Sequence, residues 1–393
     1  MDTLLNISRT MLYAAFILYL IATVFFSATI KDKTDKKRKK GIAGTLGIII
    51  TIAGFLAQLT FTITRWIASG HAPVSNLFEF MTFFGMSIVL AFIILYFIYR
   101  IGVLGVFALP LAMILIAFAS MFPTEISPLQ PSLQSHWLYI HITTVSFGNA
   151  ILSISFVAGL IYLIRQIDQS VRSKRTTWLE IVLFSLFIFV GFSVISVIFN
   201  SLDYNAQFEA PGDGNPVVTT YHLPAITGPH DATLTTEGSM DAWIEMPEWI
   251  DARKLNTVIW SVFTGFIIYV LFRLIFRKRV GAVIQPFLKR TKPDLLDEIT
   301  YRAVAIGFPV FTLGGLIFAS IWAQEAWNRF WGWDPKEVWA LVTFFFYAAF
   351  LHLRLSRGWH GERSAWLAVG GFAIIMFNLI AVNLILAGLH SYA

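Results

Sequence analysis

The chain has 393 residues, of which 57% are hydrophobic and only 13% are charged. A soluble domain carries about 25% charged residues, so this composition excludes an ordinary soluble protein. The chain has no cysteine, which excludes disulfides, thiolate metal ligands and cysteine nucleophiles. The net charge of +6 does not indicate a nucleic-acid partner, because Lys and Arg in a membrane protein mainly record its topology.

Ten apolar segments approach or exceed the length of about 20 residues that a spanning helix needs. They predict an all-α polytopic membrane protein in which residues 1–393 form a single transmembrane domain. The segments are 10–30, 43–66, 77–99, 101–122, 138–164, 179–200, 255–276, 303–325, 337–353 and 365–388.

The first segment is followed at once by seven Lys and Arg within residues 31–40. A block of this kind stays in the cytoplasm, so the segment is interpreted as a span with its N-terminus outside, and not as a signal peptide. Alternation of the spans then places 23 of the 29 Lys and Arg on the cytoplasmic side and six outside. This bias predicts a plasma-membrane protein with both termini on the outer face.

The same topology gives four outer regions, which are 67–76, 123–137, 201–252 and 326–336. The longest of them, 201–252, is polar and contains Pro-Gly-Asp-Gly-Asn-Pro and many Thr. Turn-forming residues in this density indicate extended or irregular structure.

Residues 322–339 carry five of the 13 tryptophans, which are Trp322, Trp327, Trp331, Trp333 and Trp339. One or two tryptophans at this level are typical of the interfacial aromatic belt. Five in one short segment instead predict a broad, flat apolar surface with polar N–H edges, which suits a planar macrocycle.

Part of this segment has a structural explanation. Asp334 is a good N-cap, Pro335 suits the first helical position and Glu337 falls three residues after the cap. These residues are expected to begin the ninth span, which leaves the tryptophans unexplained.

The histidines are the candidate metal ligands, because neutral imidazole is a common axial ligand of haem iron. His141 begins the fifth span and His390 ends the tenth, so the topology places both at the same height beside residues 322–339. The alternative for each is an interfacial histidine that bonds a headgroup or water. His136 is a rival to His141, but it lies five residues earlier and faces another side of the helix.

His352 lies 17 residues after Pro335, about 25 Å along a helix that rises 1.5 Å per residue. This depth places it near the cytoplasmic side of the hydrocarbon core, where an ionisable residue is a functional candidate. The alternative is a side chain that reaches the inner interface beside Arg354.

Residues 322–337 resemble the tryptophan-rich WWD signature of the haem-handling superfamily. Their Asp-Pro-Lys-Glu ending resembles the CcsA/ResC family, the System II proteins of cytochrome c biogenesis. The likeness extends to 70–79, 135–141, 301–302 and 388–392, and so covers most of the chain. The loop at 201–252 matches nothing in the compact members of the family.

The resemblance implies a haem b site on the outer face. His141 and His390 would ligate the iron, and the family pattern Trp-Leu-x-x-His selects His141 over His136. The ring would be cradled by residues of the WWD segment, namely Trp327, Trp331 and Trp333, with Asp334 beside them. For the haem propionates, position alone suggests Arg329 first and Lys336 second, although either can be a structural cation.

His352 would ligate a second haem taken up from the cytoplasmic side, and its missing counterpart would come from a partner of the ResB/CcsB type. The haem acceptor would be the Cys-x-x-Cys-His motif of apocytochrome c, within a cytochrome c synthase complex. A thiol-reducing system would act only indirectly, since this chain has no cysteine. Two alternatives stay open: a haem exporter or chaperone like the CcmC branch, and a proton-coupled solute transporter.

Overall fold

A computed structural model of the chain describes residues 2–31, 37–120, 122, 124–126, 134–211, 217–247 and 250–382. Within these residues, ten helical stretches are long and apolar enough to cross a bilayer. This confirms the predicted all-α polytopic membrane fold. The chain forms two compact units, one from Met1–Asp168 with Ile284–Ala393 and the other from Gln169–Val283.

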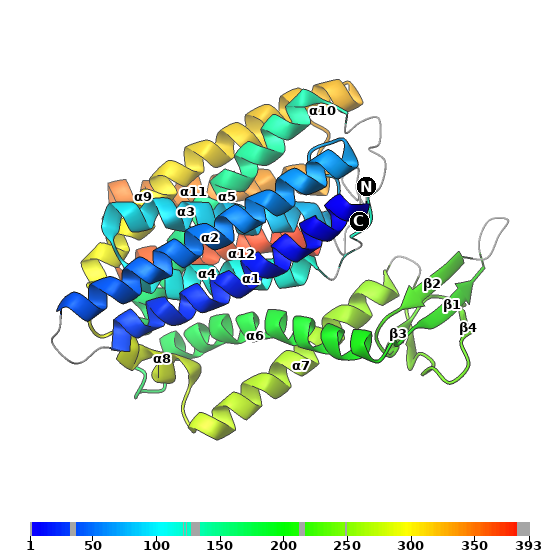
Figure 1. Ribbon diagram of the computed structural model, residues 1–393, viewed down its shortest axis with the longest axis horizontal. Helices are drawn as coiled ribbons and strands as arrows, with labels where there is room; N and C mark the ends of the chain where they lie inside the picture. The colour runs from blue at the N-terminus through cyan, green and yellow to red at the C-terminus, as the bar shows by residue number, and fades with distance from the viewer. Residues whose placement is uncertain are drawn as a thin grey trace. The chain divides into compact units, whose positions relative to one another are not determined.

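The first half of the larger unit contains four spans. They are α1 (Asp2–Lys31), α2 (Lys37–Ser69), α3 (Leu77–Tyr99) and α4 (Gly102–Ala119). Helix α1 packs along both α2 and α4, and α3 packs on α4 (Figure 1). Phe26 of α1 fills the space between them, with its ring 5.4 Å from that of Phe92.

The second half of this unit is built around α5 (His136–Gln166), which packs against α3, α9 and α12. The remaining elements are α8 (Val280–Leu288), which starts at the boundary of the units, α9 (Pro293–Thr312), the π-helical turn η2 (Leu313–Phe318), α10 (Ala319–Trp327), α11 (Pro335–Arg357), α12 (Glu362–Met376) and the π-helical turn η3 (Phe377–Ala381).

Glycines let α5 approach the α9–η2 helix closely. A Cβ added at Gly148 of α5 would collide with the backbone of Phe311, and one added at Gly314 of η2 would collide with the backbone nitrogen of Val145. Small residues at such contacts are the usual way for helices to pack closely in a membrane. Backbone groups of η2 therefore lie within reach of side chains on α5.

The smaller unit contains α6 (Lys174–Ser201), α7 (Ala252–Phe276), the segment between them and the first residues of α8. That segment corresponds to the predicted loop 201–252. It forms β1 (Ala206–Ala210), β2 (Val217–Tyr221), β3 (Thr227–Gly228), β4 (Thr233–Leu234) and β5 (Ile244–Glu245).

The strands form two small sheets. Strand β1 lies between β2 and β4 in an antiparallel sheet, and β3 pairs with β5 in parallel. Asn256 of α7 fastens them to the helix, since its side chain accepts from the Ile226 N–H and donates to the Pro224 carbonyl. The extended structure predicted for this loop is confirmed in these strands.

Candidate functional site

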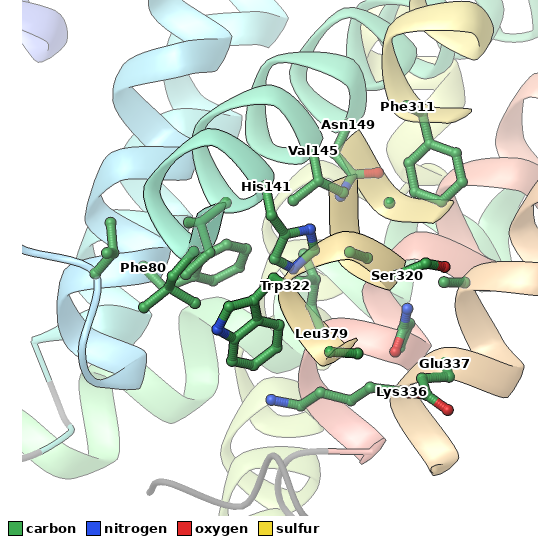
Figure 2. Close-up of a pocket in the computed structure, with 18 of the residues that line it drawn as sticks. Phe80, His141, Val145, Asn149, Phe311, Ser320, Trp322, Lys336, Glu337 and Leu379 are labelled. Carbon is green, nitrogen blue, oxygen red and sulfur yellow. The ribbon is translucent and has the colours of Figure 1, made fainter. Parts of the chain in front are cut away.

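A cavity opens in the larger unit between α5, the α9–η2–α10 helix, α11 and η3 (Figure 2). Its volume is about 190 Å³. We define its mouth by Trp327, Phe330 and Trp331, and its floor by Val145, Asn149 and Phe311. Other lining residues are Val74, Ser75, Asn76, Leu77, Phe80, Leu138, His141, Ile142, Gly315, Ala319, Ser320, Trp322, Ala323, Lys336, Glu337, Ala340, Asn378 and Leu379.

His141 lies on the cavity wall in the second turn of α5. Its Nδ1 is 2.9 Å from the backbone carbonyl oxygen of Gly314. Because a carbonyl only accepts, Nδ1 carries the proton and donates it, which leaves the lone pair of the neutral ring on Nε2. A backbone carbonyl on one ring nitrogen is the usual arrangement behind a histidine that ligates a metal through the other.

The acceptor for His141 belongs to the π turn. In η2 the Gly314 carbonyl accepts the Ala319 N–H, five residues ahead, and it also accepts His141 across the helix interface. Such turns inside α-helices occur frequently at functional sites. The close glycine contact described above brings this carbonyl to α5, so the tautomer of His141 is set by the backbone.

An aromatic wall adjoins His141. The Trp322 ring stacks on the imidazole with a centroid distance of 5.7 Å and an interplanar angle of 6°. Trp322 is 2% exposed, and its ring centroid is 4.8 Å from that of Trp327 in an edge contact. The two tryptophans and the imidazole form one continuous apolar surface along the cavity.

The other three tryptophans of the segment lie in three different surroundings. Trp331 lines the cavity mouth. Trp333 is 70% exposed and does not line it, and its backbone has a positive φ of 57°. Trp339 packs against Phe377 of η3 with a centroid distance of 4.2 Å. Of the three tryptophans predicted to cradle a ring, Trp327 and Trp331 face the cavity.

The expected start of the ninth span is confirmed. The Asp334 side chain accepts the Lys336 N–H at 3.0 Å, and the Glu337 carboxylate accepts the Asp334 N–H at 3.1 Å. Glu337 also accepts the Gly332 N–H at 2.7 Å. Asp334, which is 6% exposed, is outside the cavity lining and therefore fixes the α11 terminus.

The two cations proposed for propionates lie in different surroundings. Lys336 lines the cavity and extends toward Trp322 (Figure 2). Arg329 is exposed and is not among the lining residues. Its guanidinium packs against Gly332, where an added Cβ would lie 2.6 Å from the guanidinium carbon.

A buried ion pair holds the wall formed by Val74–Leu77. Arg65 Nε donates to Glu79 at 2.6 Å, and the two side chains are 4% and 0% exposed. The second oxygen of Glu79 accepts both the backbone N–H and the hydroxyl of Ser75. Asn76 then caps α3 by accepting the Glu79 N–H.

The other candidate histidines lie elsewhere. His352 is exposed on the surface of α11 and does not line the cavity. His390 lies outside the described residues. His71 is buried with its Nδ1 3.1 Å from the Ala72 carbonyl, and it is also absent from the cavity lining. His136 is exposed.

Several cavity residues were not predicted from the sequence. Asn149 lies eight residues after His141, and both line the cavity together with Val145. The i, i+4, i+8 spacing of these three is the signal that places them along one side of a helix. Gly314 had no comparable signal, because its importance comes from a contact between two helices.

The sequence matches the family described as Cytochrome C assembly protein over residues 74–205 and 254–390. The cytochrome c biogenesis protein CcsA of Picosynechococcus sp. is 29% identical over 353 residues, covering 89% of this chain and 87% of that protein. The protein of the same name from Nostoc punctiforme is 30% identical over 355 residues, covering 89% and 88%. That from Mesostigma viride is 28% identical over 393 residues, covering 99% and 98%.

The family match omits residues 206–253, which hold all five strands of the smaller unit. The matched residues include those that line the cavity and the whole tryptophan segment, residues 322–339. With a match over more than half of its length and ten candidate spans, the chain is an integral membrane protein of the cytochrome c assembly family.

Proposed function

We propose that this protein binds haem b and presents it for covalent attachment to apocytochrome c. The observation that carries the proposal is His141, whose Nδ1 donates to Gly314 and whose ring stacks on Trp322 beside a mainly apolar cavity. This arrangement leaves the Nε2 lone pair as the one that an iron would use. Family membership and the names of the relatives support the same activity.

The residues present suit haem as the substrate. The aromatic lining of the cavity suits a planar apolar ring, and the lining also offers polar side chains to the carboxyl groups of a haem. His141 provides one axial ligand. The second is assigned to His390, which the predicted topology places at the same height.

In the reaction that follows, each cysteine thiol of the Cys-x-x-Cys-His motif adds across one haem vinyl group. The sulfur atom forms a covalent bond to one vinyl carbon, and the thiol hydrogen is added to the other vinyl carbon. The addition therefore involves no net oxidation. The role of this chain is to hold the ring while the thiols approach. Such positioning can contribute roughly 7–11 kcal/mol to lowering a barrier.

We assign the outer face of the plasma membrane to the cavity mouth, on the bias of Lys and Arg along the sequence. His352 would take up haem near the inner face. Because it is exposed on α11, its side chain is accessible to a second protein, and a ResB/CcsB-type partner would supply the opposing ligand.

The test is to co-express the full chain with such a partner and an apocytochrome, and to measure haem that stays attached after denaturation. His141→Ala is expected to lower the yield by about tenfold or more, since the loss of groups that merely orient a metal ligand already costs 10–100-fold. His136→Ala, an exposed histidine on the same helix, is the matched control and should leave the yield unchanged.

Four other outcomes contradict parts of the proposal. If His141→Ala leaves the yield unchanged, the proposed outer site is wrong. If His352→Gly leaves the yield unchanged, the proposed inner site is wrong. Haem that binds through His141 but is never attached would favour an exporter of the CcmC type. A colourless purified protein without a bis-histidine spectrum would favour a solute transporter.

A further inference from the structure

Asn149, on the floor of the cavity, has a polar atom without a protein partner. The residue is 6% exposed, and its Oδ1 is buried with no hydrogen-bond partner among the residues that the structure describes. Leaving a buried polar group unpaired costs about 1–3 kcal/mol. A group of this kind that faces a cavity is explained if it binds a ligand.

The neighbours of Asn149 are mostly apolar. On the floor it lies between Val145 of α5 and Phe311 of α9 (Figure 2). Two other polar side chains of the lining have protein partners: Ser320 donates to the Leu316 carbonyl, and Glu337 accepts two backbone N–H groups. The carboxamide therefore offers a specific polar contact at the end of the cavity farthest from the mouth.

The distance from His141 to Asn149 suits the centre and one edge of a large planar ligand. They are eight residues apart on α5, which corresponds to about 12 Å along the helix. A ring whose iron binds His141 would thus extend one edge to the mouth and the opposite edge toward the floor. Haem carries its two vinyl groups and its two carboxyl groups on opposite edges.

The attachment chemistry decides which edge faces the floor. The thiols of an acceptor protein arrive from outside the helices, so the vinyl edge has to face the mouth. The carboxyl edge then points to Asn149. A carboxamide both donates and accepts, and can pair with a protonated carboxylic acid through two hydrogen bonds. Burial favours that neutral form of a carboxyl group.

We propose, on the basis of the haem function assigned above, that Asn149 binds a carboxyl group of the haem and thereby orients the vinyl edge toward the mouth. Asn149 is a positioning residue here, because it takes no part in forming the thioether bonds. The orientation of the haem is thus selected through its carboxyl groups, and this selection does not require an ion pair on the floor of the cavity.

The test compares haem with its dimethyl ester, in which both carboxyl groups are blocked, on the purified full-length protein. Dissociation constants for both are measured by Soret titration. The wild-type protein should prefer the free acid by about tenfold, the size expected for one hydrogen bond to a buried group. Asn149→Leu, nearly equal in volume, should reduce this preference to near one.

One further variant keeps the result decisive. Ser146→Ala is the matched control, because Ser146 is another buried and unpartnered polar residue of α5 that does not line the cavity. It should leave the preference at its wild-type value.

The preference is a ratio measured on one sample, so partial misfolding of a variant does not imitate the expected loss. A preference that persists in Asn149→Leu would overturn the proposal. So would a preference that disappears in Lys336→Met or Asn378→Leu but not in Asn149→Leu. If the wild-type protein binds neither compound, the haem function itself fails, which is a different outcome.

Discussion

Helices α5 and α7 have nearly the same mean hydropathy, 2.0 and 2.1, and opposite surroundings. Of an 18-residue apolar stretch in each, 83% is buried in α5 and 17% in α7. Helix α5 carries His141 and Asn149 on the cavity, whereas α7 exposes large apolar residues such as Phe263 and Ile275. The helix that holds the proposed chemistry is thus the one that its neighbours shield from lipid.

Both helices nevertheless use the same packing device. Gly314 contacts the backbone of α5 in the larger unit, and Gly265 of α7 contacts the backbone of α6 at Phe187 and Ile188. Only the first contact brings a carbonyl to a histidine. Close helix packing is therefore common to both units. The units differ in whether a polar side chain forms a hydrogen bond to the backbone at the close contact.

The largest effect is expected from the buried ion pair that supports the cavity wall. Glu79→Ala leaves Arg65 charged and buried, which typically costs about 3–5 kcal/mol. We expect a large drop in thermal stability in detergent and loss of haem binding. Glu298→Ala is the control, because Glu298 and Arg302 are 40% and 55% exposed and such pairs contribute at most about 1 kcal/mol. Equal effects of the two variants would contradict this expectation.

The two glycine contacts give the next effect. Gly314→Val and Gly265→Val each force a side chain into a backbone, and overpacking of this kind costs about 1–3 kcal/mol. Both should lower the thermal stability. Gly314→Val should also abolish the haem absorption band of the protein that remains folded, while Gly265→Val should preserve it. The comparison of α5 with α7 breaks down if the two spectra change alike.

The smallest effect concerns the tryptophans. Trp322→Phe keeps an aromatic ring beside His141 but weakens the stack, which is worth about 0.5–1.5 kcal/mol. We expect haem to bind roughly two- to twelvefold more weakly in a spectroscopic titration, as this energy range implies. Trp333→Phe changes an exposed ring outside the cavity and should alter the affinity little. A larger loss for Trp333 would place the ligand on the outer surface of the segment.

The sequence was sufficient for features with local causes. The ten spans follow from the length of each apolar run, and the α11 terminus follows from the capping chemistry of Asp334 and Glu337. In both cases the relevant interactions lie within one segment.

Other features depend on which segments meet. Hydropathy does not distinguish α5 from α7, since core-facing and lipid-facing helices in a membrane are equally apolar. The separation of Arg329 from Lys336, and of Trp333 from Trp331, arises from the turn between α10 and α11. Asn149 and Gly314 acquire their roles only through contacts with other helices.

The π turn η2 also changes which face of the helix points to the cavity, between the stretch before it and the stretch after it in one continuous span. A single inserted residue rotates everything beyond it by about 100° relative to an uninterrupted α-helix. Phe311 lies before the turn and Trp322 after it, yet both face the same cavity. Removal of one residue from 313–318 would swing the aromatic wall away from His141 without altering a single lining side chain, so the count of residues there is as constrained as their identity.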